Sequence, residues 1–256
     1  MAALTVELLP ALSDNYIYLL HEADSGTTAV VDPAEPGPVV AALERHGWTL
    51  DWILNTHHHI DHIGGNAALK DRYGAKIAGP RAEVSRIADM DRTVGQGDEV
   101  AVGGETARVF ETPGHTSGHI AFWFESSKAL FCGDTLFPLG CGRLFEGTPA
   151  EMWDSLCKLR ELPDDTRIYC GHEYTAGNAK FALTVEPDNT ELAARAEEIA
   201  AARARGEPTI PSLLGLEKRT NPFLRADLPQ LQAAIGMPGS STVTAFAEVR
   251  GRKDRF

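Results

Sequence analysis

The stretch Thr56-His57-His58-His59-Ile60-Asp61-His62 holds four of the nine histidines of this 256-residue chain. It follows Trp52-Ile53-Leu54-Asn55, a short apolar run that predicts a β-strand. Alternate side chains of an extended segment share a face, so we expect His57 and His59 to point one way and His58 the other. Two neutral imidazoles on one face can chelate a borderline metal such as zinc or iron. The stretch therefore predicts a metal site at the end of a strand.

Asp61 and His62 stand where the chain must leave the sheet, and they can approach a second metal beside the first. Gly64-Gly65 then removes side-chain bulk at the start of the next helix and permits close backbone approach. A lone histidine is usually a surface or core residue, but this spacing after an apolar strand is far more specific.

Three later segments repeat one design, in which a strand reaches a glycine and then a side chain that can bind metal. They are Pro113–His119, Phe131–Thr135 and Tyr169–Glu173, and they offer His115, Asp134 and His172. Loops at strand ends are where a rigid scaffold usually displays reactive groups. These segments are the candidates to complete the metal shells.

The composition, 43% hydrophobic and 23% charged, is ordinary for a soluble enzyme. No run approaches the roughly 18 apolar residues of a membrane helix, and the first basic residue is Arg45, so we expect neither membrane association nor a targeting peptide. The predicted compartment is the cytoplasm. Four cysteines without a CxxC pair predict reduced core thiols.

The net charge of −12 argues against a nucleic-acid partner bound through a broad basic face. Residues 1–174 carry 13 basic and 26 acidic residues, whereas residues 175–256 carry 11 and 10. The ending Arg250–Phe256 is a cationic cluster, and composition alone predicts a solvated basic tail.

Strand and helix patterns alternate up to Tyr174 and predict an α/β layered domain over residues 1–174. Beyond it the sequence is rich in Ala, Leu, Glu and Arg, which predicts a smaller helical domain over residues 175–256. Within that domain Thr209–Pro222 is interpreted as a Pro-containing connector. The predicted strands are Tyr16–His21, Thr28–Val31, Trp52–Asn55, Lys76–Ala78, Arg108–Glu111, Ile120–Phe124, Ala129–Cys132 and Arg167–Cys170; the predicted helices are Val39–His46, Asn66–Tyr73, Ala150–Arg160, Ala179–Val185, Glu191–Arg205 and Leu228–Ile235.

The complete histidine and aspartate set resembles that of the metallo-β-lactamase-fold hydrolases, which implies their αββα sandwich. The resemblance assigns His57, His59 and His115 to one metal, Asp61, His62 and His172 to a second, and Asp134 to a bridge between them. His58 and His119 fall outside this ligand pattern. It implies two divalent ions per chain, zinc first, with iron or manganese as alternatives.

Within this superfamily the chain resembles the glyoxalase II (hydroxyacylglutathione hydrolase) family over its full length. The segments that carry the resemblance are Gly140–Thr148, Cys170–Thr175, Asn221-Pro222-Phe223 and Arg250-x-x-Lys253-Asp254. The resemblance implies substrate contacts by Arg143, Phe145, Tyr174, Arg250 and Lys253. Some members have a tyrosine at position 145, so Phe145 lacks that hydroxyl contact.

The implied reaction is hydrolysis of the thioester S-D-lactoylglutathione to D-lactate and glutathione, a step of methylglyoxal detoxification. A hydroxide bridging the metals, held with Asp61 and Asp134, would attack the carbonyl. We expect a monomer. The alternative is a persulfide dioxygenase, which shares the first motif but uses one iron. A non-catalytic module on this fold is a further alternative that metal analysis would separate.

Overall fold

The computed structural model describes residues 4–256. The chain forms two compact units. The first unit runs to Glu111 and includes Gly118–Gly133; the second comprises Thr112–Ser117 and Asp134–Phe256. The boundary near residue 175 was predicted from composition, and it stays a prediction.

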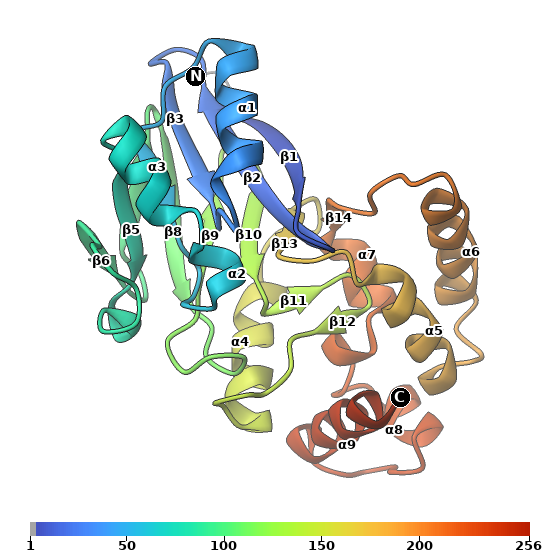
Figure 1. Ribbon diagram of the computed structural model, residues 1–256. Coiled ribbons are helices and arrows are strands. Elements are labelled where there is room, and N and C mark those ends of the chain that lie inside the picture. Colours follow the sequence, from blue (N-terminus) through green and yellow to red (C-terminus); the bar gives the residue numbers. More distant parts are fainter. Residues whose placement is uncertain (1–3) are drawn as a thin grey trace. The chain divides into compact units, whose positions relative to one another are not determined.

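One sheet of the first unit contains six strands in sequence order. They are β1 Thr5–Ala11, β2 Asn15–Glu22, β3 Thr27–Val31, β4 Trp52–Leu54, β5 Lys76–Pro80 and β6 Arg92–Val94. β1 to β3 run antiparallel, and β3 to β6 run parallel. Helices α1 (Pro36–His46) and α3 (Asn66–Tyr73) lie on one side of this sheet (Figure 1). Because neighbouring parallel strands end at the same edge, the residues after β3 and β4 are brought together there.

The second sheet of this unit is an antiparallel meander of β7 (Glu99–Val102), β8 (Glu105–Glu111), β9 (Ile120–Phe124) and β10 (Ala129–Gly133). All residues of β9 and β10 are buried, so these strands are covered on both faces. Tyr18 of the first sheet meets Phe131 of the second with ring centroids 5.5 Å apart. One part of the core therefore lies between two stacked sheets, and another lies between the first sheet and the helices α1 and α3, as the α/β layered prediction requires.

The second unit is mainly helical. Its elements are β11 Leu136–Phe137, β12 Gly140–Cys141, α4 Pro149–Arg160, β13 Arg167–Cys170, α5 Thr175–Val185, α6 Thr190–Ala204, β14 Ser212–Leu213, α7 Leu214–Thr220, the 3-10 helix η2 Pro222–Leu224, α8 Pro229–Ala234 and α9 Thr242–Arg255. Several of these helices begin at a residue whose side chain caps the helix. Thr148 and Glu151 form a capping box at α4, and Asn189 and Ser241 cap α6 and α9.

Two expectations about the carboxyl-terminal part were wrong. The supposed connector Thr209–Pro222 contains β14 and α7. The supposed solvated tail is the last part of α9, and Arg250 within it is only 5% exposed. Both errors have one cause: the buried faces of α7 and α9 come from packing against other elements, which composition does not reveal.

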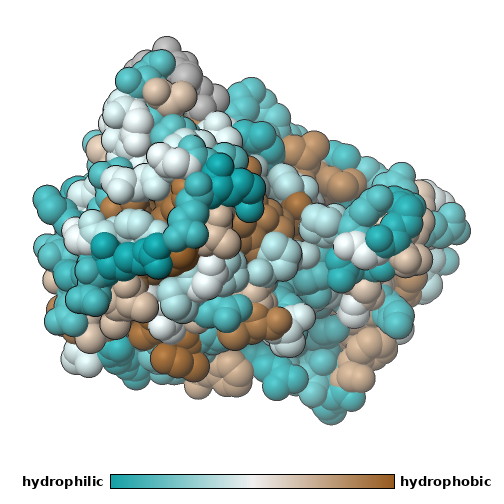
Figure 2. All heavy atoms as spheres, turned by 45° about the horizontal axis from the view of Figure 1, so that its top comes forward, coloured by the Kyte–Doolittle hydropathy of each residue, from teal (hydrophilic) through white to brown (hydrophobic). Residues whose placement is uncertain are grey.

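The surface hydropathy, the helices and the cysteines can each be compared with what the composition predicts. Hydrophilic residues cover most of the face seen in Figure 2, with hydrophobic ones in separate patches. Among residues 4–256, no helix has both the length and the apolar character to cross a membrane. Residues 4–256 contain no disulfide; Cys132, Cys141 and Cys170 are buried, as predicted for core thiols, whereas Cys157 is half-buried.

Candidate metal centre

The first group of predicted ligands follows β4, at the edge where β3 also ends. His57 is fully buried, and its Nε2 lies 3.1 Å from Nδ1 of His59, with the two rings nearly perpendicular. His58 points elsewhere, since its Nδ1 lies 3.1 Å from a carboxylate oxygen of Glu83. The predicted alternation of these three side chains is therefore confirmed.

Asp32, the residue after β3, fixes the histidine rings. Its Oδ1 accepts from the Thr56 backbone N–H at 2.8 Å, and its Oδ2 accepts from the Thr56 hydroxyl at 2.6 Å. The Thr56 proton is thus committed to Asp32, so at the 3.0 Å contact between Thr56 Oγ1 and His57 Nδ1 the ring must donate. His62 Nδ1 likewise lies 3.1 Å from Asp32 Oδ2. Both rings therefore keep Nε2 as a lone-pair donor for a metal.

Asp61 and His62 lie on α2 (Ile60–Ile63), a single turn after the strand. The Asp61 Oδ2 atom is 3.8 Å from His62 Nε2. The Asn15 amide orients Asp61 by donating to its Oδ2 at 3.2 Å and to its backbone carbonyl at 3.1 Å. Asp61 and His62 thus present an oxygen and a nitrogen side by side.

Glycines allow this segment its close approaches. A Cβ on Gly64 would lie 2.4 Å from the Ala34 carbonyl oxygen, and one on Gly65 would lie 2.8 Å from that of Pro33. The Gly65 N–H donates to the same Pro33 oxygen at 2.7 Å. The predicted close approach of the backbone at Gly64-Gly65 is confirmed, and it fixes α2 against the segment that carries Asp32.

His119 is a buried neighbour of the first group. Its ring stacks on His57, with centroids 4.6 Å apart and an interplanar angle of 24°. Gly133 has a φ of 46°, and a Cβ there would lie 2.9 Å from His119 Nε2 and 2.3 Å from Thr56 Oγ1. The glycine before Asp134 is therefore needed for both backbone conformation and space.

The second unit gathers His115, Asp134 and His172. Nε2 of His115 lies 3.3 Å from Asp134 Oδ2, and Nε2 of His172 lies 3.4 Å from the same oxygen. All three are at most 6% exposed. His115 Nδ1 donates to the Arg143 carbonyl at 2.9 Å, so in the neutral ring the Nε2 lone pair faces the carboxylate. Two acceptors this close need a cation near them, which fits a metal-binding set.

Phe145 and Tyr174 stand on the exposed side of this second group. Phe145 is 61% exposed, and its ring lies 5.1 Å from that of His115. Tyr174 is 42% exposed and stacks on His172, with centroids 4.8 Å apart and an angle of 3°. Each aromatic side chain therefore covers a predicted ligand while leaving a face open to a substrate.

Arg250 and Lys253 lie one turn apart on α9. Arg250 Nη1 donates to the Cys141 carbonyl at 2.9 Å, its Nη2 donates to Asp254 at 2.9 Å, and its guanidinium lies over the Phe223 ring. Lys253 Nζ lies over the Phe181 and Phe256 rings. Burial lowers the pKa of Lys253, and the nearby charges of Arg250 and Arg143 lower it further. Three cations close enough to perturb one another would favour an anion among them.

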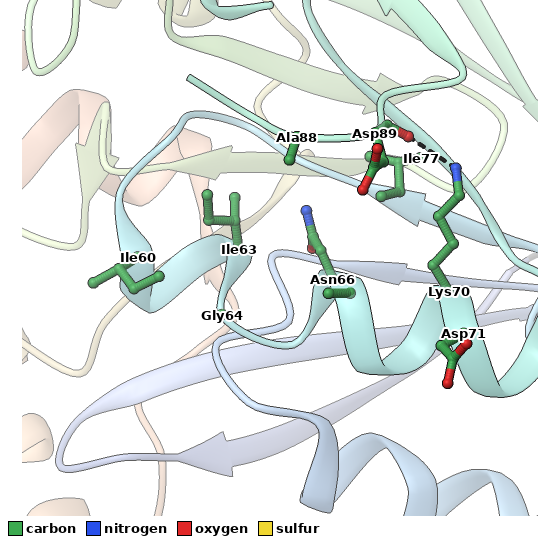
Figure 3. A pocket seen from close by; sticks show the side chains of 10 residues that line it. Ile60, Ile63, Gly64, Asn66, Lys70, Asp71, Ile77, Ala88 and Asp89 are labelled. Atoms are coloured by element: carbon green, nitrogen blue, oxygen red, sulfur yellow. Dashed lines mark hydrogen bonds between the residues drawn. The ribbon is translucent and has the colours of Figure 1, made fainter. Parts of the chain in front are cut away.

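A separate pocket lies beside α2 in the first unit, with a cavity volume of about 430 Å³. Ile63 and Asn66 line it, and Lys70 closes one side by donating to the Asp89 carbonyl at 2.8 Å (Figure 3). None of the predicted ligands or substrate contacts lines this pocket.

Sequence reasoning missed Asp32, Thr56 and Asn15 as supports of the ligands. Asp32 had a detectable signal, because Thr28–Val31 is an apolar strand followed at once by an acid, the same design as the segment that ends at Asp134. Asn15 had none, since its role depends on pairing between distant segments.

Two family models match the chain. Residues 12–172 match the metallo-beta-lactamase superfamily, and residues 173–256 match the hydroxyacylglutathione hydrolase C-terminus. A hydroxyacylglutathione hydrolase of Rhodospirillum rubrum is 55% identical over 256 residues, which is all of both chains. The chain belongs to the hydroxyacylglutathione hydrolase family. A second relative of that name, from Rhodopseudomonas palustris (strain BisB5), is 55% identical over 98% of this chain and 99% of its own length.

Members of this family are thioester hydrolases on the metallo-β-lactamase fold, which confirms the predicted fold with its carboxyl-terminal helical domain. The histidine and aspartate clusters and the superfamily point to a divalent metal. Among solved structures, ETHE1 from Myxococcus xanthus is 25% identical, with a TM-score of 0.70, over 96% of this chain and 90% of that one.

Proposed function

We propose that the chain hydrolyses S-D-lactoylglutathione to D-lactate and glutathione, a step of methylglyoxal detoxification. The observation that carries this proposal is the match to relatives named hydroxyacylglutathione hydrolase, with 55% identity over the whole chain. The carboxyl-terminal family model supports it too, because that region supplies Tyr174, Arg250 and Lys253.

We further propose that two divalent ions, zinc first and iron or manganese as alternatives, bind to the predicted ligands. His57, His59 and His115 would hold one ion, Asp61, His62 and His172 the other, and Asp134 both. The donors are imidazole nitrogens and carboxylate oxygens, which suit these metals. When bound, the ions would lower the pKa of a water molecule and polarise a carbonyl.

The chain's own residues would hold the reacting groups in place. Thr56, itself held by Asp32, fixes the tautomer of His57; Asp32 fixes that of His62, and Asn15 orients Asp61. The departing group is the glutathione thiolate, whose conjugate acid has a pKa of about 8.5 by analogy with cysteine. When the carbon–sulfur bond breaks, the sulfur can therefore leave as an anion, and no general acid is required from the protein.

Glutathione carries two carboxylates, so its recognition needs cations on an otherwise acidic chain. Arg143, Arg250 and Lys253 would supply them, while Phe145 and Tyr174 would contact the peptide portion. Burial, and after it the charges of Arg250 and Arg143, lower the pKa of Lys253, and this supports the role because an anion would relieve the repulsion among the three cations.

The persulfide dioxygenase alternative has one point in its favour, the likeness to ETHE1 at 25% identity. The 55% identity to hydroxyacylglutathione hydrolases outweighs it. Oxygen uptake with glutathione persulfide as substrate separates the two: the hydrolase should consume no oxygen. A monomeric, cytoplasmic enzyme remains a prediction for gel filtration and cell fractionation.

The proposal is tested by following thioester hydrolysis with lactoylglutathione and with a lactoyl thioester of a simple thiol. We expect kcat/KM to be higher for lactoylglutathione by a factor of about 100 or more, since only that substrate offers the peptide and its carboxylates. Equal values for the two thioesters would contradict the substrate assignment.

A further inference from the structure

The turn that joins β11 to β12, Phe137–Cys141, has its carbonyl groups held by amide side chains from distant helices. Asn221, after α7, donates from Nδ2 to the Phe137 and Gly140 oxygens, both at 3.0 Å. Asn178 of α5 donates from Nδ2 to the Pro138 oxygen at 3.1 Å. Both asparagines are at most 6% exposed, so water competes little for these bonds.

Two further polar contacts of the turn involve charged side chains. The Leu139 N–H donates to the carboxylate of Glu217 at 2.8 Å, and the Cys141 carbonyl accepts from Arg250 at 2.9 Å. Glu217 is fully buried and is itself paired with Arg195. Hydrogen bonds from α5, from α7 and its end, and from α9 therefore hold the five successive residues of this turn in place.

The turn needs these hydrogen bonds because its backbone is strained. Leu139 is a buried, bulky residue with a φ of 57°, a conformation that such side chains rarely adopt. Gly140 beside it has no room for a side chain, since a Cβ would lie 2.4 Å from Nδ2 of Asn178. Such a conformation persists only where the surrounding structure holds it in place.

The turn stands between two parts of the proposed site. Asp134 precedes it by three residues, and Arg143 follows it by two. The Gly142 N–H donates to the Thr135 carbonyl at 3.2 Å, which links the two sides, and the Arg143 carbonyl accepts from His115. A change in the turn would therefore move Arg143 and Phe145 first.

We propose that Asn221 and Asn178 are positioning residues for glutathione binding: through the Phe137–Cys141 turn they fix Arg143 and Phe145. This inference rests on the proposed function, because it needs a substrate with a glutathione portion. Binding of the glutathione portion, and not the hydrolysis of the acyl group, is the step that they control.

The test compares Asn221→Ala and Asn178→Ala with a matched control, Gln232→Ala. Gln232 is also a buried amide in the second unit, but it donates to the Ala226 carbonyl at 3.0 Å, away from the turn. We expect Asn221→Ala to raise KM for lactoylglutathione about tenfold and Asn178→Ala to raise it severalfold, with kcat nearly unchanged. The rate with a lactoyl thioester of a simple thiol should stay the same.

The inference is overturned if the KM for lactoylglutathione is unchanged, or if both substrates and the Gln232→Ala control are affected alike. Circular dichroism and the metal content are measured for each variant, because a positioning role should alter neither. If Asn221→Ala does not fold, the milder Asn178→Ala variant decides. A wild-type chain inactive on lactoylglutathione would instead refute the proposed function.

Discussion

At the scale of single residues, the side chains that contact the predicted ligands explain why those ligands could bind a metal. Nε2 of His57 and Nε2 of His62 keep their lone pairs because Thr56 and Asp32 accept the protons on Nδ1 of these rings. Four of the seven predicted ligands, at positions 57 to 62, are visible as one motif, and the other three each follow a strand and a glycine. Asn15 is not visible in this way, because it reaches Asp61 across 46 residues.

Replacing Asp32 by asparagine should weaken metal binding about 10- to 100-fold, as for other residues that orient metal ligands. Asparagine tolerates the φ of 48° at this position, so the backbone should keep its shape. An amide nitrogen accepts no hydrogen bond, so asparagine must lose the contacts of one Asp32 oxygen: the Thr56 N–H, or the Thr56 hydroxyl and His62. Competition with a chelator measures the affinity, and an unchanged affinity would contradict the assigned role of Asp32.

Lys253 should make glutathione binding sensitive to alkaline pH. Its pKa is lowered by burial and by two nearby cations, so it loses its proton at a lower pH than an ordinary lysine. Below the lowered pKa the ammonium attracts the substrate carboxylate, and above it that attraction is lost. We therefore expect KM to rise on the alkaline side, with kcat much less affected.

Lys253→Arg is the control for this pH dependence, because arginine stays charged throughout the range. The alkaline rise of KM should be absent in that variant. An identical profile in the wild type and Lys253→Arg would show that another group titrates.

At the scale of elements, every predicted strand and helix is present, but the seven-residue β1, the strands β6 and β7, and the helices α7 and α9 were not predicted. Asn66–Tyr73 and Ile120–Phe124 have the bounds that their patterns indicate. α7 and α9 escaped prediction because their buried faces depend on tertiary packing, which composition does not reveal. The strands β11 and β12 are two residues each, and side chains from other helices hold the turn between them.

The start of α4 offers a test of a local rule. The Thr148 hydroxyl accepts from the Glu151 N–H, and the Glu151 carboxylate accepts from the Thr148 N–H at 2.8 Å. We expect Thr148→Ala to lower the free energy of unfolding by about 1 kcal/mol. Denaturant titration measures it; Thr148→Ser should retain most of the stability, and a loss as large in Thr148→Ser would contradict the capping role.

At the scale of the whole molecule, the distribution of charge along the chain fits the family to which the chain belongs. The amino-terminal part is strongly acidic, whereas residues 175–256 carry nearly equal numbers of basic and acidic residues, with Arg250 and Lys253 on the last helix. The sequence could indicate the fold and the ligands because they follow from a local motif and its repeats at strand ends. It could not indicate that Arg250 is buried against Phe223, because that contact depends on how distant helices pack.

The two-metal account predicts a specific result for the proposed bridge. Asp134→Ala should leave the first-unit ligands intact but lower the metal content and reduce turnover by a factor of about 1,000 or more. Elemental analysis and kinetics on the same sample measure both quantities. Full metal content together with full activity would refute the bridging role.

The most direct measurement is kcat/KM of the metal-loaded chain for S-D-lactoylglutathione against a lactoyl thioester of a simple thiol. The account predicts rapid release of glutathione and D-lactate from the first, a preference of about 100-fold or more over the second, and loss of both activities on chelation. Equal kcat/KM values for the two thioesters, or hydrolysis that survives complete removal of metal, would contradict it.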